Sequence, residues 1–208
     1  MTPQEVEAYF TQPDGTYGFA RWGRPIAPIV FGVEDETLKV VKGALQAISV
    51  LTKHEIVETD PELGSNLMFF FFREWDELLD VPDLDKLIPE MKVLVTKLKS
   101  GGANQYRLFR FEESGAIKAA FVFIRMDAEL AEIPAETLAL QQVVQTVLLW
   151  GNGAFREKSP LGVTESGKTI LRPDVSEVLR AAYDPVLPDV AHDKSHALRL
   201  FARLELPR

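Results

Sequence analysis

The sequence predicts an α/β (α+β) fold in which helices pack on a mixed sheet, and three observations carry this prediction. Segments with helical periodicity alternate with short apolar segments, as in a sheet covered by helices. Two strand-like segments, 105–112 and 116–126, are separated only by the turn-forming residues Glu113-Ser-Gly115, which predicts an antiparallel hairpin. The segment 65–73 (SNLMFFFFR) carries a continuous apolar run of strand length, typical of a strand buried on both faces.

Helices are expected in several segments: 2–10, 36–53, 84–98, 137–150, 174–183 and 192–203. The first has Pro3 and acidic residues in its first turn, which favours a helix start. In the second, apolar residues recur at intervals of three and four from Leu38 to Leu51. Glycines at Gly101-Gly102 and at Gly151-Asn-Gly153 are expected to end the third and fourth helices.

Two segments are expected to be less regular. Residues 24–33 (RPIAPIVFGV) read as a strand, but their prolines indicate an edge strand or an irregular start. Residues 160–168 are predicted to form a loop. Because no linker, internal repeat or low-complexity tract interrupts the chain, residues 1–208 are expected to form a single globular domain.

Composition bounds the possible functions. The 31 acidic and 23 basic residues give a net charge of −8, which argues against a nucleic-acid partner and against docking on an anionic membrane. Hydrophobic residues make up 46% and charged residues 26%, so the chain can bury a sizeable core. The absence of cysteine excludes disulfides, Cys-ligated zinc, iron–sulfur clusters and thiol nucleophiles. No cofactor is indicated.

The N-terminal sequence, Met1-Thr-Pro-Gln-Glu-Val-Glu, has neither the basic region nor the apolar region of a signal peptide. A chain from which a signal had been removed would look the same, so the compartment stays open. The longest apolar run, Leu67–Phe72, has six residues. A membrane-spanning helix needs about 20 apolar residues, so no membrane span is expected.

The segment 162–169 (GVTESGKT) matches the phosphate-binding pattern G-x-x-x-x-G-K-[ST]. That motif needs a buried strand before the loop and a helix that begins at the lysine. Here residues 155–160 (FREKSP) do not resemble a buried strand, and Pro173 would interrupt a helix that began at Lys168. We therefore expect an exposed turn, with nucleotide binding at Gly162–Thr169 as a minor alternative.

His192 and His196 are spaced at i and i+4, with aspartates nearby. On a helix this spacing places two imidazoles on one face, as zinc ligands require. However, no glutamate lies between them, and a solvated helix start explains the pattern equally well. No metal site is predicted here. A hydrolase that uses His192 and His196 with acids such as Glu136 or Asp184 remains a second hypothesis.

Three glutamines lie on one side of the predicted helix 137–150. Gln141 and Gln145 are one turn apart, and Gln142 lies between them in azimuth. This is the spacing of H-E-x-x-H, in which two histidines bind zinc and the glutamate is the general base. A carboxamide is a poor zinc ligand and cannot take up a proton as a base. This helix therefore predicts no metal and no catalytic residue, and a helix whose polar side meets solvent is the alternative interpretation.

The same helix carries a family resemblance. A bacterial family of exported proteins of unknown function, which look like degenerate zincin metallopeptidases, has a core helix that reads E-E-x-x-Q-x-L-G-L-x-N-D. The run 141–152 (QQVVQTVLLWGN) resembles it, with Gln145, Leu149 and Asn152 near the family's Gln, Leu and Asp. The two acids are absent in this chain, and Leu148 replaces the glycine.

A second block, 179–187 (LRAAYDPVL), is similar to that family's L-R-x-L-Y-D-P-x-L, although no Gly-Met follows it. Weaker matches are Arg21-Trp22 with Pro25-Ile26, and Ser65-Asn66. The resemblance spans most of the chain in order. It implies a zincin-like α/β architecture and an exported or periplasmic location, with the cytoplasm as the alternative.

We therefore expect a non-catalytic, zincin-like scaffold that binds a neutral polar ligand or a peptide backbone. The candidate ligand-binding residues are Gln141, Gln142, Gln145, Asn152 and Tyr183. The aromatic run Phe69–Phe72 is compatible with a protein partner, but burial in the core explains it more simply. The sequence leaves the ligand and the oligomeric state open.

Overall fold

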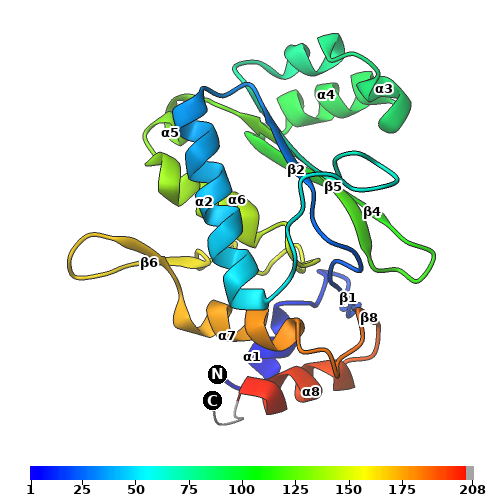
Figure 1. Ribbon diagram of the computed structural model, residues 1–208, viewed down its shortest axis with the longest axis vertical. Coiled ribbons are helices and arrows are strands. Elements are labelled where there is room, and N and C mark those ends of the chain that lie inside the picture. The colour runs from blue at the N-terminus through cyan, green and yellow to red at the C-terminus, as the bar shows by residue number, and fades with distance from the viewer. Residues whose placement is uncertain (205–208) are drawn as a thin grey trace.

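A four-stranded mixed sheet lies at the centre of the computed structural model, which describes residues 1–204 (Figure 1). Its order is β2 (Pro28–Phe31), β3 (Leu67–Phe72), β5 (Ile117–Arg125) and β4 (Gln105–Phe111). The first three strands are parallel, and β4 pairs antiparallel with β5. The predicted mixed sheet and the predicted hairpin are confirmed. Strands β2 and β4 form the two open edges of the sheet.

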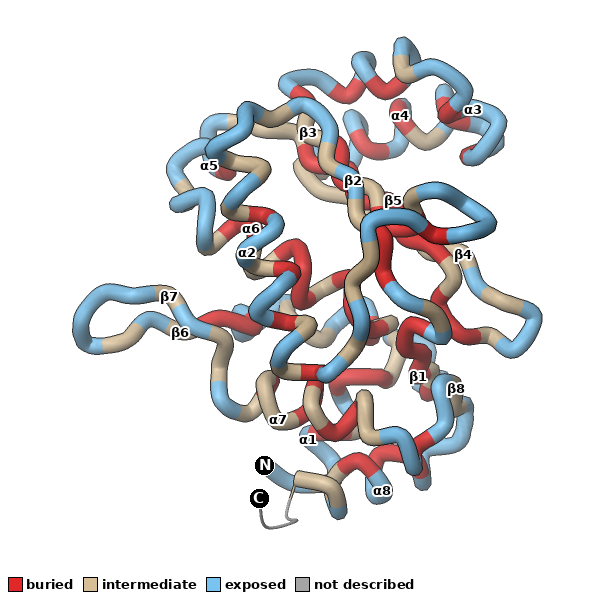
Figure 2. Tube along the Cα trace, in the orientation of Figure 1, coloured by how far each residue is buried: buried red, intermediate tan, exposed pale blue. Residues whose placement is uncertain are grey.

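Helices cover both faces of this sheet. On one face lie α2 (Asp35–Thr52) and α6 (Ala135–Val144), and on the other lie the 3₁₀ helix η1 (Trp75–Asp80), α3 (Leu84–Leu87) and α4 (Met91–Ser100). Adjacent side chains of β3 point to opposite faces of the sheet: Phe69 packs in the α2–α6 core and Phe70 in the α4 core. The prediction that this strand is buried on both faces is confirmed (Figure 2).

The end of the molecule away from α3 and α4 is built from segments distant in sequence (Figure 1). There α8 (Ser195–Leu204) packs against both α1 (Pro3–Ala8) and α7 (Pro173–Ala182). The remaining elements are the short strand pair β1 (Phe19–Ala20) and β8 (Val190–Ala191), the single-turn helix α5 (Ala128–Ala131), and the hairpin of β6 (Leu161–Val163) and β7 (Thr169–Leu171). Among residues 1–204, no helix combines the length and the apolar character needed to cross a bilayer.

The expected helix 84–98 is interrupted. The chain leaves α3 at Ile88, which has φ −126° and ψ 92°, and α4 begins only at Met91. The cause is Pro89, because a proline ring pushes the preceding residue out of the helical region and itself has no N–H to donate. The prediction of one continuous helix was wrong, although both pieces face the same core.

The expected helix 137–150 is shorter at its C-terminal end than predicted. Helix α6 ends at Val144, and Leu148 forms a bridge to Arg21 beside β1. Side chains hold the end of the helix: the Thr146 hydroxyl donates to the Val143 carbonyl, and Trp150 Nε1 donates to the Val144 carbonyl. β-branched residues have low helix propensity, so these local hydrogen bonds and the bridge to Arg21 decide where the helix ends.

Two further boundaries differ from the expectations. The segment 160–168 forms one arm and the turn of the hairpin β6–β7 rather than a loop, and the C-terminal helix begins at Ser195 rather than at His192. Strand β2 is an edge strand and is shorter than the segment 24–33, as its prolines indicated.

Candidate functional site

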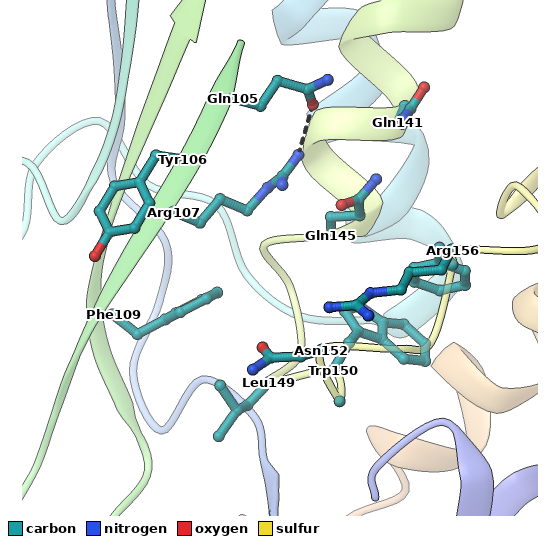
Figure 3. A pocket seen from close by; sticks show the side chains of 12 residues that line it. Gln105, Tyr106, Arg107, Phe109, Gln141, Gln145, Leu149, Trp150, Asn152 and Arg156 are labelled. Carbon is teal, nitrogen blue, oxygen red and sulfur yellow. Dashed lines mark hydrogen bonds between the residues drawn. The ribbon is translucent and has the colours of Figure 1, made fainter. Parts of the chain in front are cut away.

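A cavity of about 540 Å³ lies between the open edge of β4 and the C-terminal end of α6, and it is called here the β4–α6 cleft (Figure 3). It is lined on one side by β4 residues 105–107 and 109, and on the other by Gln141 and Gln145 of α6. The segment after α6 closes it with residues 149–152, 155 and 156. Its volume is in the range of small-molecule and peptide-side-chain pockets.

Strand β4 presents unpaired backbone groups to this cleft. The Arg125 N–H donates to the Asn104 carbonyl, so residue 104 faces β5. In an antiparallel pair the partner-facing residues alternate, so the N–H and C=O groups of Gln105, Arg107 and Phe109 point away from β5. In the described part of the chain these groups form no hydrogen bond with another backbone segment. The edge is therefore open to an added strand.

Amide side chains without intramolecular partners line the opposite wall. The Gln141, Gln145 and Asn152 side chains form no hydrogen bond with another described residue, and all three border the cleft. Each carboxamide offers both a donor and an acceptor, which matches the alternating N–H and C=O groups of a peptide. The structure thus brings together three of the five residues that the sequence singled out.

Gln142 does not reach the cleft in the same way. Its side chain is buried, its Nε2 donates to Gln105 Oε1 at 2.7 Å, and its Oε1 accepts from Arg107 Nη2 at 2.5 Å. The sequence placed all three glutamines on a polar side of the helix. In the structure Gln142 instead joins α6 to β4, because a buried amide must satisfy its hydrogen bonds within the protein.

Two arginines carry the charge of the cleft. Arg107 reaches from β4 toward α6, and Arg156 enters from the segment after α6 (Figure 3). Burial lowers the pKa of the Arg107 guanidinium to about 10, so the group is still charged at neutral pH. No aspartate or glutamate lines the cleft, although the chain has 31 of them.

An apolar wall completes the site. Phe109, Leu149 and Phe155 border the cleft together with Trp150, whose ring lies edge-on to Phe155 with centroids 4.9 Å apart. Trp150 also stacks on Phe10 of the N-terminal segment at 5.5 Å. The cleft therefore combines aromatic surface with amides and cations, and this combination suits a ligand with both apolar and polar parts.

Tyr183 lies away from the glutamines. It borders a second cavity, of about 580 Å³, with Arg21, His54 and Asp184. Its hydroxyl donates to the Val147 carbonyl at 2.6 Å, which supports the segment after α6 from beneath. Burial raises the pKa of the Tyr183 hydroxyl, so it stays protonated. The expectation that Tyr183 lines the same site as Gln141 was wrong.

Arg21, which borders the second cavity, makes several contacts within the protein. Its Nη1 donates to the carbonyls of Ala182 (2.7 Å) and Asp184 (3.1 Å), and its Nη2 donates to that of Leu187 (3.0 Å). Its Nε is ion-paired with Asp189 at 2.7 Å. The guanidinium thus holds the turn that contains Tyr183 against β1. His54 is likewise engaged, with Nε2 2.9 Å from the Arg24 carbonyl. The Arg21, His54 and Tyr183 side chains that border this cavity are thus bonded within the protein itself.

The two C-terminal histidines occupy different environments. His192 is exposed and precedes α8, whereas His196 is buried in its first turn, with Nδ1 2.9 Å from the Tyr17 hydroxyl. The i, i+4 spacing predicted that they share one helix face, and in the structure they do not. Asp184, one of the acids considered with them, is ion-paired with Arg203, and Glu136 is exposed on α6. Within residues 1–204, no three His, Cys, Asp or Glu side chains converge in a way that holds a metal ion.

The buried His196 predicts a pH-dependent stability. Burial, with Arg199 and Arg21 nearby, lowers the pKa of His196 to about 4. The unfolded chain binds a proton near pH 6.5, so stability falls as the pH drops from about 6.5 to about 4, by up to about 1.4 kcal/mol per pH unit. Urea unfolding between pH 7.5 and 5 is expected to show a shallower pH dependence for His196→Gln than for the wild type. Parallel curves for the two proteins would contradict this.

The phosphate-binding pattern folds as a hairpin. Gly162 lies in β6 and Thr169 in β7, and Gly167 has a φ of +80° in the turn between them. No helix begins at Lys168, because β7 follows it. The helix N-terminus that binds phosphate in that motif is therefore missing here. The structure contains the exposed turn that the sequence predicts.

The sequence missed the β4 wall of the site. The alternation in 105–111 (QYRLFRF) places Gln105, Arg107 and Phe109 on one face of a strand. Non-local strand pairing determines which face of β4 meets α6 and leaves β4 at an edge, and no local sequence pattern reveals this pairing. No protein-family model matches the chain, and comparisons with curated proteins and with solved structures likewise give no match.

Proposed function

We propose that the protein is a non-catalytic, zincin-like scaffold whose β4–α6 cleft binds an extended peptide. The observation that carries this proposal is the open edge of β4 lying opposite side-chain amides that have no partner within the described chain. A strand added to β4 would satisfy the outward backbone groups of residues 105, 107 and 109. Its side chains would enter the space between β4 and α6.

The positions of the glutamines support the non-catalytic part of the proposal. Gln141 and Gln145 border the cleft at the spacing of the two zinc-binding histidines of H-E-x-x-H. Gln142, at the position of the general base, is buried and hydrogen-bonded to Arg107. A carboxamide does not accept a proton at neutral pH and is a poor zinc ligand, so these residues suit binding rather than hydrolysis. The family resemblance of 141–152 is the basis for calling the scaffold zincin-like.

Amide hydrogen exchange tests the strand-addition mode directly. The probe is a pool of capped heptapeptides with degenerate sequence, added to the protein and followed by NMR. The backbone amides of Gln105, Arg107 and Phe109 are expected to become protected, because they would donate to the added strand. Those of Tyr106 and Leu108 already face β5 and are expected to change little. Binding without protection at the three outward positions would exclude strand addition to β4.

A double variant tests the amide wall. Gln141→Ala with Gln145→Ala removes two side chains that form no hydrogen bond in the described structure, so the free energy of unfolding is expected to change by about 0.5 kcal/mol or less. Affinity for the peptide pool is expected to fall roughly thirtyfold, since two hydrogen bonds are lost and each contributes about 1 kcal/mol. Gln4→Ala, an exposed glutamine on α1, is the matched control. Unchanged affinity in the double variant would contradict the proposal.

A further inference from the structure

The β4–α6 cleft has a charge opposite to that of the whole protein. The chain carries a net charge of −8, yet the ionisable groups that line this cavity are the cations Arg107 and Arg156, apart from the neutral Tyr106. Neither arginine forms an ion pair with a described carboxylate. This contrasts with Arg21, Arg24, Arg125, Arg172 and Arg203, which all do.

Arg107 is held in place without being neutralised. Its Nη2 donates to Gln105 Oε1 at 3.2 Å and to Gln142 Oε1 at 2.5 Å, and both acceptors are neutral amides. Its Nε is buried with no hydrogen-bond partner, and no hydrogen bond to Nη1 occurs in the described structure. A partly buried guanidinium without a counter-charge is unusual, because an arginine fork normally pairs with a carboxylate or phosphate.

From this arrangement we propose that the peptide bound in the cleft presents an acidic side chain, aspartate or glutamate, to the Arg107 guanidinium. This inference rests on the proposed peptide binding and specifies the ligand. An anion supplies what the site lacks, since Nη1 of Arg107 has N–H groups without an acceptor and the surrounding amides cannot neutralise the charge. Arg156 lies across the cleft and adds a second cation near the same position (Figure 3).

The place of Arg107 along β4 distinguishes an acidic side chain from a C-terminal carboxylate. The outward backbone positions are 105, 107 and 109, and Arg107 is the middle one. A strand that pairs with all three continues on both sides of Arg107. The peptide residue that lies beside Arg107 is therefore inside the bound segment, where only a side chain supplies a carboxylate.

The experiment compares three degenerate heptapeptide pools by fluorescence anisotropy. The first has a central glutamate and capped ends, the second a central glutamine and capped ends, and the third a central glutamine with a free C-terminal carboxylate. For the wild type at low salt, the glutamate pool is expected to bind roughly tenfold more tightly than the capped glutamine pool, as one charge-assisted pair predicts. That preference is expected to shrink as salt is added.

Variants identify which arginine binds the acidic side chain of the peptide. Arg107→Gln is expected to abolish the preference for glutamate, so that the ratio of the affinities for the glutamate pool and the capped glutamine pool falls to about one. Arg156→Ala removes an exposed side chain and is expected to weaken the preference without affecting the fold. Arg73→Ala, an exposed arginine at the end of β3, makes the same change in net charge outside the cleft and is the matched control.

The outcomes separate this inference from the proposed function. Binding of all three pools with equal affinity would overturn the acidic side chain and leave peptide binding intact. Tighter binding of the free-carboxylate pool would overturn the side-chain assignment in favour of a C-terminus. Absence of binding by every pool would overturn both proposals. A glutamate preference that survives in Arg107→Gln, with the fold shown intact by circular dichroism, would overturn the role of Arg107.

Discussion

Replacing Arg21 with methionine is expected to lower the free energy of unfolding by about 3–5 kcal/mol, the largest effect among the substitutions considered. The side chain is buried, and its guanidinium donates to three backbone carbonyls, those of Ala182, Asp184 and Leu187. Methionine fills a similar volume but donates nothing, so these carbonyls lose their partner in a place that water does not easily reach. Asp189 loses less, because its side chain is half exposed.

Denaturation in guanidinium chloride measures this effect. Arg21→Lys is expected to recover only part of the loss, since an ammonium group cannot match the fork of contacts that a guanidinium makes. Lys194→Ala is the control, because it breaks a largely exposed ion pair with Glu7 and is expected to cost less than about 1 kcal/mol. A loss of about 1 kcal/mol or less for Arg21→Met would show that Arg21 does not hold the Tyr183 turn in place.

The contacts of Arg21 also show how two blocks that are distant in sequence meet in the structure. Arg21-Trp22 and the run 179–187 lie far apart in the chain. In the structure Arg21 clamps the end of α7, and its guanidinium lies 5.6 Å from the centroid of the Tyr183 ring. These residues hold the end of α7 against the segment at Arg21 and do not line the β4–α6 cleft.

The parts of the fold that local pattern determines were predicted from sequence. Strand β3 and the hairpin β4–β5 follow from apolar runs and a glycine turn, both of which act within a few residues. The end of α6 was not predictable in this way, because the bridge from Leu148 to Arg21, a contact distant in sequence, draws the chain toward β1. The break at Pro89 did have a local signal, which the helical periodicity around it obscured.

The same distinction between local and non-local determinants applies to the residues of the candidate site. Gln141, Gln145 and Asn152 were predicted to act together, and they border one cleft because α6 and the segment after it are close in sequence. Arg107 was missed, since its significance depends on the strand order that leaves β4 at an edge and on the lack of a nearby carboxylate. Neither property is visible in a single sequence.

Replacing Gly151 with alanine is expected to cost about 3 kcal/mol and to abolish peptide binding. The sequence suggested that this glycine ends a helix, yet α6 ends before it, at Val144. Its N–H donates to the Tyr9 carbonyl at 2.8 Å, and a Cβ at this position would lie only 2.5 Å from the Thr11 carbonyl oxygen. Because that oxygen belongs to the backbone, the two segments would have to move apart.

Such a movement would reach the cleft directly, since Gly151 lies between Trp150 and Asn152, which both line it. Gly153→Ala is the matched control: a Cβ there meets no atom within 4 Å, so its stability is expected to stay within about 0.5 kcal/mol of the wild type. Urea unfolding and the peptide anisotropy assay measure the two effects. If Gly151→Ala were as stable and as competent in binding as Gly153→Ala, the close packing of this segment on Thr11 would not be what shapes the cleft.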